Sequence, residues 1–494
     1  MKIKNKKNSA DFQLVKGPVP ILMTLFIVLA FLFIPLFQLT DLPLVNTVQA
    51  ATLVLPAEDQ PEESCSWVQV NDGAFGLGGG PDGRYSGEEG FETLVFSDRL
   101  YLGMEWDSAY GARLWRTKSA VQTPGGQEDW EEVIADASGY PFGVPLITQN
   151  DHIDSLAEFN GYLYASTANG GSNLLGTRVF RSLTGDPGSW EDALAAYGAG
   201  FGSVYNTNFK DMVVYNNWLC GGTQNWDTGT QVWCSNDGVA WIKKNKGGFG
   251  NRINNMNNVK VYSGYTYDQG LYFGVQNVGE NLSNSSDDVA KLFRTTSLEG
   301  TPTWIEVFSG APGSRQVDIL GEVGGYLYIA TESLSGIRIY RSPSADLGSW
   351  SQVNLDGMDG DPSNTGTVAD GAVVYNDELN IAVSNLVGGF KLWRTSGNLV
   401  GGGLLVEWVQ TGANGLGDAN NVYSQLSVFN GEIYAWTSNY SSGQQVLRYA
   451  CSFEPSPTPT EPVCMEGKED CQSPGSSPDL SHRVFLPLVL SLNR

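Results

Sequence analysis

The chain has 494 residues and is acidic, with 53 Asp and Glu against 29 Lys and Arg and a net charge of −24 at pH 7. This balance argues against a nucleic-acid partner, because phosphate binding needs clustered lysine and arginine. The two histidines are too few for a histidine-rich zinc centre, and 60 glycines with 14 tryptophans and 21 tyrosines favour a turn-rich β protein.

The first 50 residues are organised like an export segment. Lysines between Lys2 and Lys16 precede an apolar run, and Val48-Gln49-Ala50 has the small-residue form of a cleavage site. The run is also nearly long enough to span a bilayer, so residues 1–50 are either a signal peptide, which we favour, or an uncleaved anchor and the only contact with a membrane. Either alternative places the rest of the chain outside the cytoplasm, secreted or at the cell surface, after a linker over residues 51–64.

A repeating unit fills residues 65–452. Each unit has an apolar strand, a G-x-L-Y strand, a Gly-rich turn, a third strand ending in an aromatic residue and Arg, and a W-x-x-V segment. The second-strand position recurs at Tyr101, Tyr164, Cys220, Tyr272, Tyr328, Asn380 and Tyr434. Four short strands per repeat are typical of propeller blades, so the sequence predicts an all-β, seven-bladed β-propeller with four-stranded blades.

The last unit lacks its fourth strand, because the chain runs into a Pro-rich tail after Arg448. The missing pattern occurs instead at the start of the exported chain, in Ser66–Val70. We predict that this N-terminal strand completes blade seven and closes the ring, which leaves no open sheet edge. Cys65 and Cys451 then lie side by side in an antiparallel pair, and a disulfide between them would lock the closure.

Six cysteines in an exported chain suggest three disulfides. Cys220 and Cys234 replace the Tyr and Arg of the repeat in the third unit and face each other across a hairpin, which predicts a second bond. Cys464 and Cys471 are expected to close a small loop in the tail. Free thiols are the alternative.

The third unit ends in S-N-D-G-V-A-W, from Ser235 to Trp241, with Asp237 and Gly238 at the turn. This segment resembles a degenerate Asp-box, the S-x-D-x-G-x-x-W turn of BNR repeats in sialidase-type and sortilin-type propellers. The resemblance covers roughly residues 66–451 and implies the architecture alone. In those families the box is structural and lies away from the ligand.

The connection from each outer strand to the next blade carries a Gly-rich turn such as G-A-F-G. We interpret Phe75, Phe142, Phe201 and Phe249 in these turns as plugs between blades, with ligand stacking as the alternative. In similar folds such loops surround the funnel where ligands bind, and amide-rich loops suit sugar hydroxyls as well as plain turns. The candidate ligand-binding residues are Arg84, Arg252, Arg315, Asn254 and Asn257. No catalytic residue is assigned, because none of the arginines stands in a catalytic motif.

Oxygen ligands gather in D-G-M-D-G-D-P-S-N, whose candidates for calcium are Asp356, Asp359, Asp361 and Asn364. The spacing departs from the EF-hand loop, so a plain acidic turn is the alternative. Asp151 and Asp154 form a weaker candidate. No other cofactor is expected.

After Cys451 the composition changes. Residues 453–480 form a Pro/Ser/Thr-rich tail expected to be disordered, and residues 481–494 are apolar but too short to span a membrane. The sequence therefore predicts a monomeric, exported propeller that is a non-enzymatic binding or interaction module for carbohydrate or protein. A glycan-acting hydrolase or lyase of sialidase type is one alternative, and a structural or adhesive surface domain is another.

Overall fold

The computed structural model describes residues 63–76, 87, 89–105, 112–133, 142, 150–169, 175–250, 257–278, 288–400 and 403–453. All of them belong to one compact unit, Gln60–Arg494. The predicted export segment, the tail beyond Phe453 and the Cys464–Cys471 pair lie outside the described residues. Within the described ranges, no helix is both long enough and apolar enough to cross a membrane.

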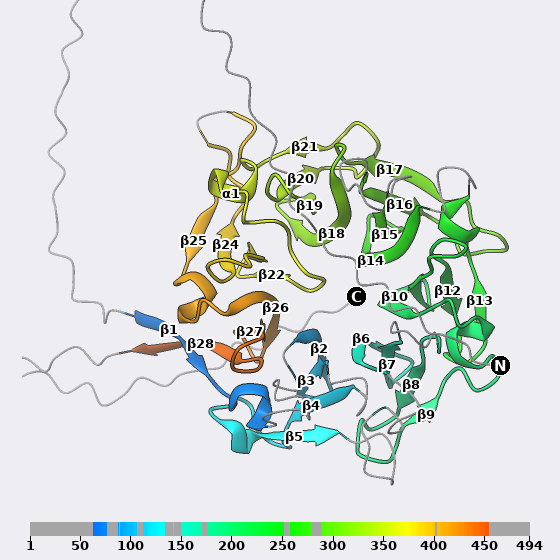
Figure 1. The fold of residues 1–494 in the computed structure, drawn as a ribbon, viewed down its shortest axis with the longest axis horizontal. Coiled ribbons are helices and arrows are strands. Elements are labelled where there is room, and N and C mark those ends of the chain that lie inside the picture. The colour runs from blue at the N-terminus through cyan, green and yellow to red at the C-terminus, as the bar shows by residue number, and fades with distance from the viewer. Residues whose placement is uncertain are drawn as a thin grey trace, which may run out of the picture. The chain divides into compact units, whose positions relative to one another are not determined.

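The unit is an all-β propeller whose sheets are arranged in a ring, and the innermost strands are β2, β6, β10, β14, β18, β22 and β26 (Figure 1). Five sheets have four antiparallel strands each. They are β2 (Gly90–Phe96), β3 (Arg99–Met104), β4 (Arg113–Thr117) and β5 (Trp130–Val133); β6 (His152–Phe159), β7 (Tyr162–Ala168), β8 (Val179–Ser182) and β9 (Glu191–Asp192); β18 (Ser314–Val323), β19 (Tyr326–Ser333), β20 (Arg338–Ser342) and β21 (Ser351–Gln352); β22 (Ala372–Tyr375), β23 (Glu378–Val383), β24 (Lys391–Thr395) and β25 (Val409–Thr411); and β26 (Asn421–Phe429), β27 (Glu432–Asn439), β28 (Val446–Phe453) and β1 (Glu63–Gln69).

The other eight strands form a single sheet. They are β10 (Asn208–Tyr215), β11 (Trp218–Gln224), β12 (Val232–Ser235), β13 (Trp241–Lys243), β14 (Asn258–Tyr267), β15 (Gly270–Asn277), β16 (Lys291–Thr295) and β17 (Ile305–Ser309). One bridge, Gln224 to Lys260, joins β11 to β14. The described structure thus has five separate four-stranded blades. The predicted number of separate blades, seven, is therefore wrong. A side chain at Gly222 would lie 2.0 Å from Val261, so this glycine lets the two strands approach closely enough to bond.

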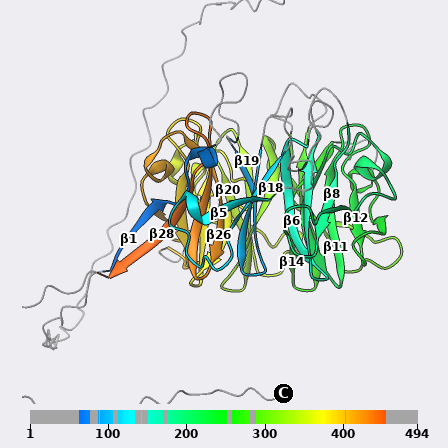
Figure 2. The same cartoon turned by 90° about the horizontal axis from the view of Figure 1, so that it is seen from below.

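The chain start supplies the outer strand of the sheet that holds the last strands. β1 pairs antiparallel with β28, and the two strands run side by side in Figure 2. Cys65 lies opposite Cys451, and a disulfide joins them. The ring therefore closes as the sequence predicts, with the first strand paired to the last.

A cross-strand pair recurs where the repeat has its Tyr and Arg. Tyr101 faces Arg116, whose Nη1 donates to the phenol oxygen at 2.9 Å and whose Nη2 reaches Asp186 of the next sheet at 2.8 Å. Cys220 faces Cys234 at the same place, and they form the second predicted disulfide. The arginines therefore tie neighbouring sheets together, as Arg294 also does with Asp346.

The Asp-box-like turn has the structural role that the resemblance implies. Ser235 Oγ accepts from the amide of Gly238, and Asp237 Oδ1 accepts from the amides of Val239 and Ala240. Gly238 has φ of +82°, and a Cβ there would lie 1.7 Å from the Tyr164 hydroxyl oxygen, so only glycine fits. The turn thereby seats one sheet against the next.

The phenylalanines of the connecting turns are plugs, as predicted. Phe75 is 4% exposed and stacks on Trp115 with ring centroids 4.2 Å apart, and Phe249 stacks on Phe293 at 4.3 Å. Phe75 and Phe201 themselves adopt positive φ, of 52° and 57°. Burial of the Phe75 and Phe201 rings, which are 4% and 6% exposed, offsets this backbone cost and leaves these two rings no face for a ligand.

Candidate functional site: an axial polar cavity

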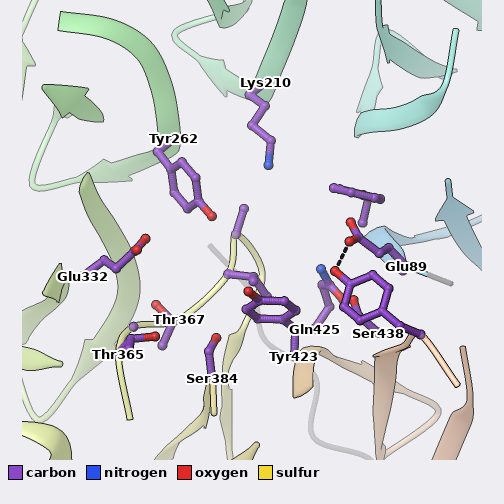
Figure 3. A pocket seen from close by; sticks show the side chains of 16 residues that line it. Glu89, Lys210, Tyr262, Glu332, Thr365, Thr367, Ser384, Tyr423, Gln425 and Ser438 are labelled. Carbon is purple, nitrogen blue, oxygen red and sulfur yellow. Dashed lines mark hydrogen bonds between the residues drawn. The ribbon is translucent and has the colours of Figure 1, made fainter. Parts of the chain in front are cut away.

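A cavity of about 250 Å³ lies on the axis of the ring. Its residues come from β2, β10, β14, β19, β26 and β27, and from the segments that flank β2, β22, β23 and β27. Its polar and aromatic lining residues are Glu89, Phe91, Lys210, Tyr262, Glu332, Thr365, Thr367, Ser384, Tyr423, Gln425, Ser438 and Tyr440 (Figure 3). The connections into the first strands contribute to this cavity, so it lies at the face where the sequence predicts a funnel.

The innermost strands position the cavity side chains. Side chains two residues apart point to the same face of a strand, which brings Tyr423 and Gln425 of β26 to the cavity together. Tyr262 of β14 and Lys210 of β10 reach it from the joined sheet. Polar groups from several sheets thus meet in a common space.

A tyrosine–glutamate pair stands at one side of the cavity. The Tyr440 hydroxyl donates to Glu89 Oε1, and Glu332 lies on the opposite side (Figure 3). Burial, and then the negative charge of Glu89, raise the pKa of Tyr440, so its phenol stays protonated. The cavity therefore offers a phenol donor, hydroxyl groups and two separate carboxylates.

A charged cluster lies along the innermost strands around Lys210, which is 5% exposed. Its Nζ lies 4.0 Å from Asp154 Oδ1. Burial lowers the pKa of Lys210, but the surrounding carboxylates of Asp154, Asp211 and Glu92 outweigh burial, and the net pKa is raised. The ammonium therefore stays charged and compensates the acids around it.

A second cavity, of about 120 Å³, shares Val368 and Ala369 with the first and is lined by the carboxyl groups of Asp211, Asp318 and Asp370. Burial and then Asp370 raise the pKa of Asp211 to about 7. Burial also raises the pKa of Asp318, although Thr367 donates to its Oδ2 at 2.6 Å. Part of this cluster is therefore protonated near neutral pH.

Because the pKa of Asp211 is raised on folding, the folded state binds this proton more tightly than the unfolded chain. The stabilisation is complete below about pH 4 and is lost as pH rises through about 7. Between pH 4.5 and 7.5 we expect the Asp211 titration to lower the free energy of unfolding by on the order of 2 kcal/mol, and Asp211→Asn to remove this decrease. Urea unfolding across this pH range measures it. Asp359→Asn is the control. The range stops below pH 8 because burial and Lys210 lower the pKa of Lys260 to about 8, and that titration has the opposite sign.

None of the predicted ligand-binding residues that the structure describes lines this cavity. Arg84, Arg252 and Asn254 lie outside the described residues, and Asn257 is described but does not line the cavity. Arg315 of β18 does not line the cavity either, but its Nη1 lies 3.5 Å from Oε1 of Glu332, which does. Sequence reasoning missed Lys210, Tyr262, Tyr423 and Tyr440, whose one signal was their position on or beside the inner strands.

The predicted calcium ligands are held by the protein's own cations. Asp359 and Asp361 both contact Lys391 Nζ at 3.2 Å, whereas Asp356 pairs with Arg338 at 2.8 Å. Asn364 is buried and donates to the carbonyl of Gly357 at 2.8 Å. A calcium ion at Asp359 and Asp361 would have to displace Lys391, and calcium binding stays a prediction.

No family model and no curated protein matches the chain. Solved structures with similar folds include the Trypanosoma rangeli sialidase in complex with 2,3-difluorosialic acid, with a TM-score of 0.39, 13% identity and coverage of 60% of this chain and 53% of that one. A Mycobacterium tuberculosis puromycin-hydrolyzing peptidase matches with a TM-score of 0.46, 11% identity and coverage of 78% and 54%. The β-propeller domain of the Trilobed protease from Pyrococcus furiosus matches with a TM-score of 0.40 and 8% identity. The match covers 74% of this chain and 96% of that domain.

The chain therefore spans about half the length of the sialidase and of the peptidase. The strand order of the chain itself defines it as a β-propeller protein.

Proposed function

We propose that this protein is an exported, non-enzymatic binding module whose axial cavity holds a carbohydrate. The observation that carries the proposal is the lining, in which Tyr262, Tyr423 and Phe91 stand beside hydroxyl, amide and carboxylate groups. Aromatic faces pack on the apolar faces of sugar rings, and the polar groups bond their hydroxyls. The volume of about 250 Å³ is smaller than a drug-sized pocket and suits a single sugar residue.

The cavity favours carbohydrate over the protein ligand that the sequence left open. A stable protein partner covers about 800 Å² of surface on each side, whereas this site is a small recess on the axis. Export is supported by the basic and apolar start of the chain and by the two disulfides, which form in oxidising compartments.

We also propose that the ring works as seven blades. Within the eight-stranded sheet, β10 to β13 and β14 to β17 each pair in sequence order, and a single bridge links the two sets. Each set carries its own cross-strand pair, Cys220 with Cys234 and Tyr272 with Arg294. Two blades joined at one point account for this pattern.

A glycan hydrolase is the second candidate, and the Tyr440–Glu89 pair favours it. A sialidase-type mechanism uses a tyrosine–glutamate pair, but it also needs three arginines that converge on the substrate carboxylate. Among the described lining residues the cation is Lys210, and none is an arginine. The described side of the cavity therefore supports binding better than that reaction.

Tyr423→Ala is expected to weaken sugar binding about tenfold, because stacking of this size contributes about 1.4 kcal/mol. The measurement is a glycan array followed by calorimetry on each sugar that binds. The control is Tyr375→Ala, which removes a tyrosine at the end of β22 that does not line the cavity.

Fluorogenic glycosides test the second candidate in the same samples. Turnover by the wild type that Glu89→Gln abolishes would establish the hydrolase instead. If the wild type binds no sugar and hydrolyses none, both carbohydrate functions are wrong.

A further inference from the structure

Three potential metal ligands meet beside the axial cavity. Glu89 precedes β2, Glu105 follows β3, and His152 begins β6. One ligand atom from each lies within 4.8 Å of the other two. Two carboxylates and one imidazole form a mixed oxygen and nitrogen set.

The backbone holds these residues together. The Glu105 amide donates to the Glu89 carbonyl at 3.0 Å, which extends the β2–β3 ladder by one pair and places the two glutamates side by side. A Cβ at Gly103 would lie 2.7 Å from Ile153, so the missing side chain lets β6 approach β3. His152, next to Ile153, is thereby brought to Glu105, with Nε2 3.9 Å from Oε1.

Groups behind the three ligands orient them. His152 Nδ1 lies 3.2 Å from Asp151 Oδ1, on the opposite edge of the imidazole from Nε2. The two atoms do not have the geometry of a hydrogen bond, but a small rotation of the imidazole would form one, which would fix the tautomer and turn Nε2 toward a metal. Phe91 packs edge-on against the imidazole with ring centroids 4.1 Å apart, and Tyr440 donates to Glu89.

We propose that Glu89, Glu105 and His152 bind one divalent transition-metal ion of the zinc or manganese class. The imidazole disfavours calcium, which takes six to eight oxygen ligands. Ligand atoms around such an ion are roughly 3.4 Å apart when the bonds are about 2.1 Å, so the glutamate side chains close by about 1 Å on binding. Three protein ligands leave an open position, and because Glu89 lines the axial cavity, the ion stands at its edge.

The competing explanation is that the histidine itself is the cation. Burial lowers the pKa of His152, but Asp151, Glu105 and Glu89 outweigh it, and the net pKa is raised. A protonated His152 would pair with the carboxylates and bind no metal. The two explanations differ in what the protein does when metal is added at pH 7.5.

The test is titration of the exported full-length protein with Zn²⁺ and Mn²⁺ after dialysis against a chelator, with Co²⁺ absorption as a second readout. One ion per chain is expected to bind. His152→Gln and Glu105→Gln are expected to weaken binding at least 100-fold, and Asp151→Asn by 10- to 100-fold because it only orients the histidine. Glu158→Gln, at an exposed position on the same strand as His152, is the matched control and should bind as the wild type does.

No uptake by the wild type, equal affinity in His152→Gln, or displacement by equimolar Ca²⁺ would each overturn the proposal. If His152→Gln does not fold, Glu105→Gln and Asp151→Asn, checked by circular dichroism, decide. The assay contains no carbohydrate, so its outcome is independent of the proposed ligand.

Discussion

Replacing Lys210 with methionine is expected to lower the free energy of unfolding by about 3–5 kcal/mol at pH 7, because one partner of a buried charge cluster is removed and the others remain. The lysine is 5% exposed, and carboxylates from several sheets face its ammonium, among them Asp154, Asp211 and Glu92. Methionine keeps most of the side-chain volume, so the loss measures charge compensation more than packing.

The pH dependence distinguishes charge from packing. The pKa of Glu92 is raised by burial and by Asp370, and that of Asp211 by burial and by Asp370, so acid neutralises the cluster. The penalty in Lys210→Met should therefore be smaller at pH 5 than at pH 7, measured by urea unfolding. Lys243→Met, at an exposed position on β13, should cost less than about 0.5 kcal/mol at both values. An equal penalty at the two pH values would contradict the electrostatic explanation.

The sequence predicted the features that repeat along the chain. The second-strand Tyr and third-strand Arg recur at fixed places, and so their pairing could be extended to Cys220 with Cys234. The antiparallel pairing of the first strand with the last predicted Cys65 beside Cys451. The paired residues lie on neighbouring antiparallel strands of one sheet, so the order of the strands determines which residues lie opposite each other. The joining of β11 to β14 was missed, because it depends on one close approach between sheets at Gly222.

The axial cavity could not be predicted in the same way, since its residues do not repeat. Lys210, Tyr262 and Tyr423 come from three different inner strands and meet only because the ring brings those strands to one axis. In the acidic segment, the sequence did not predict that Lys391, about 30 residues later, contacts Asp359 and Asp361, two of the expected calcium ligands. The small number of histidines argued against a histidine-rich zinc centre. It did not predict that His152 lies close to two glutamates from a neighbouring sheet.

Replacing Cys65 and Cys451 with serine is expected to remove about 3–5 kcal/mol of stability while leaving β1 paired with β28. The bond joins residues 386 apart, and the chain-entropy model gives about 6 kcal/mol for a loop of that size, of which native disulfides typically realise less. The hydrogen bonds from β1 to β28 do not involve the sulfur atoms, so the double variant should still fold. Urea unfolding with the Cys220–Cys234 bond intact measures the difference.

Reduction provides an internal control for this prediction. Cys451 is exposed, whereas Cys220 and Cys234 are completely buried, so a mild reductant should reach the closing bond first. Reduction should lower the unfolding midpoint of the wild type to that of Cys65→Ser/Cys451→Ser and leave the double variant unchanged. If neither reduction nor the two substitutions lowered the unfolding midpoint, the hydrogen bonds of β1 would be enough to close the ring. The disulfide would then contribute little to the stability of the propeller.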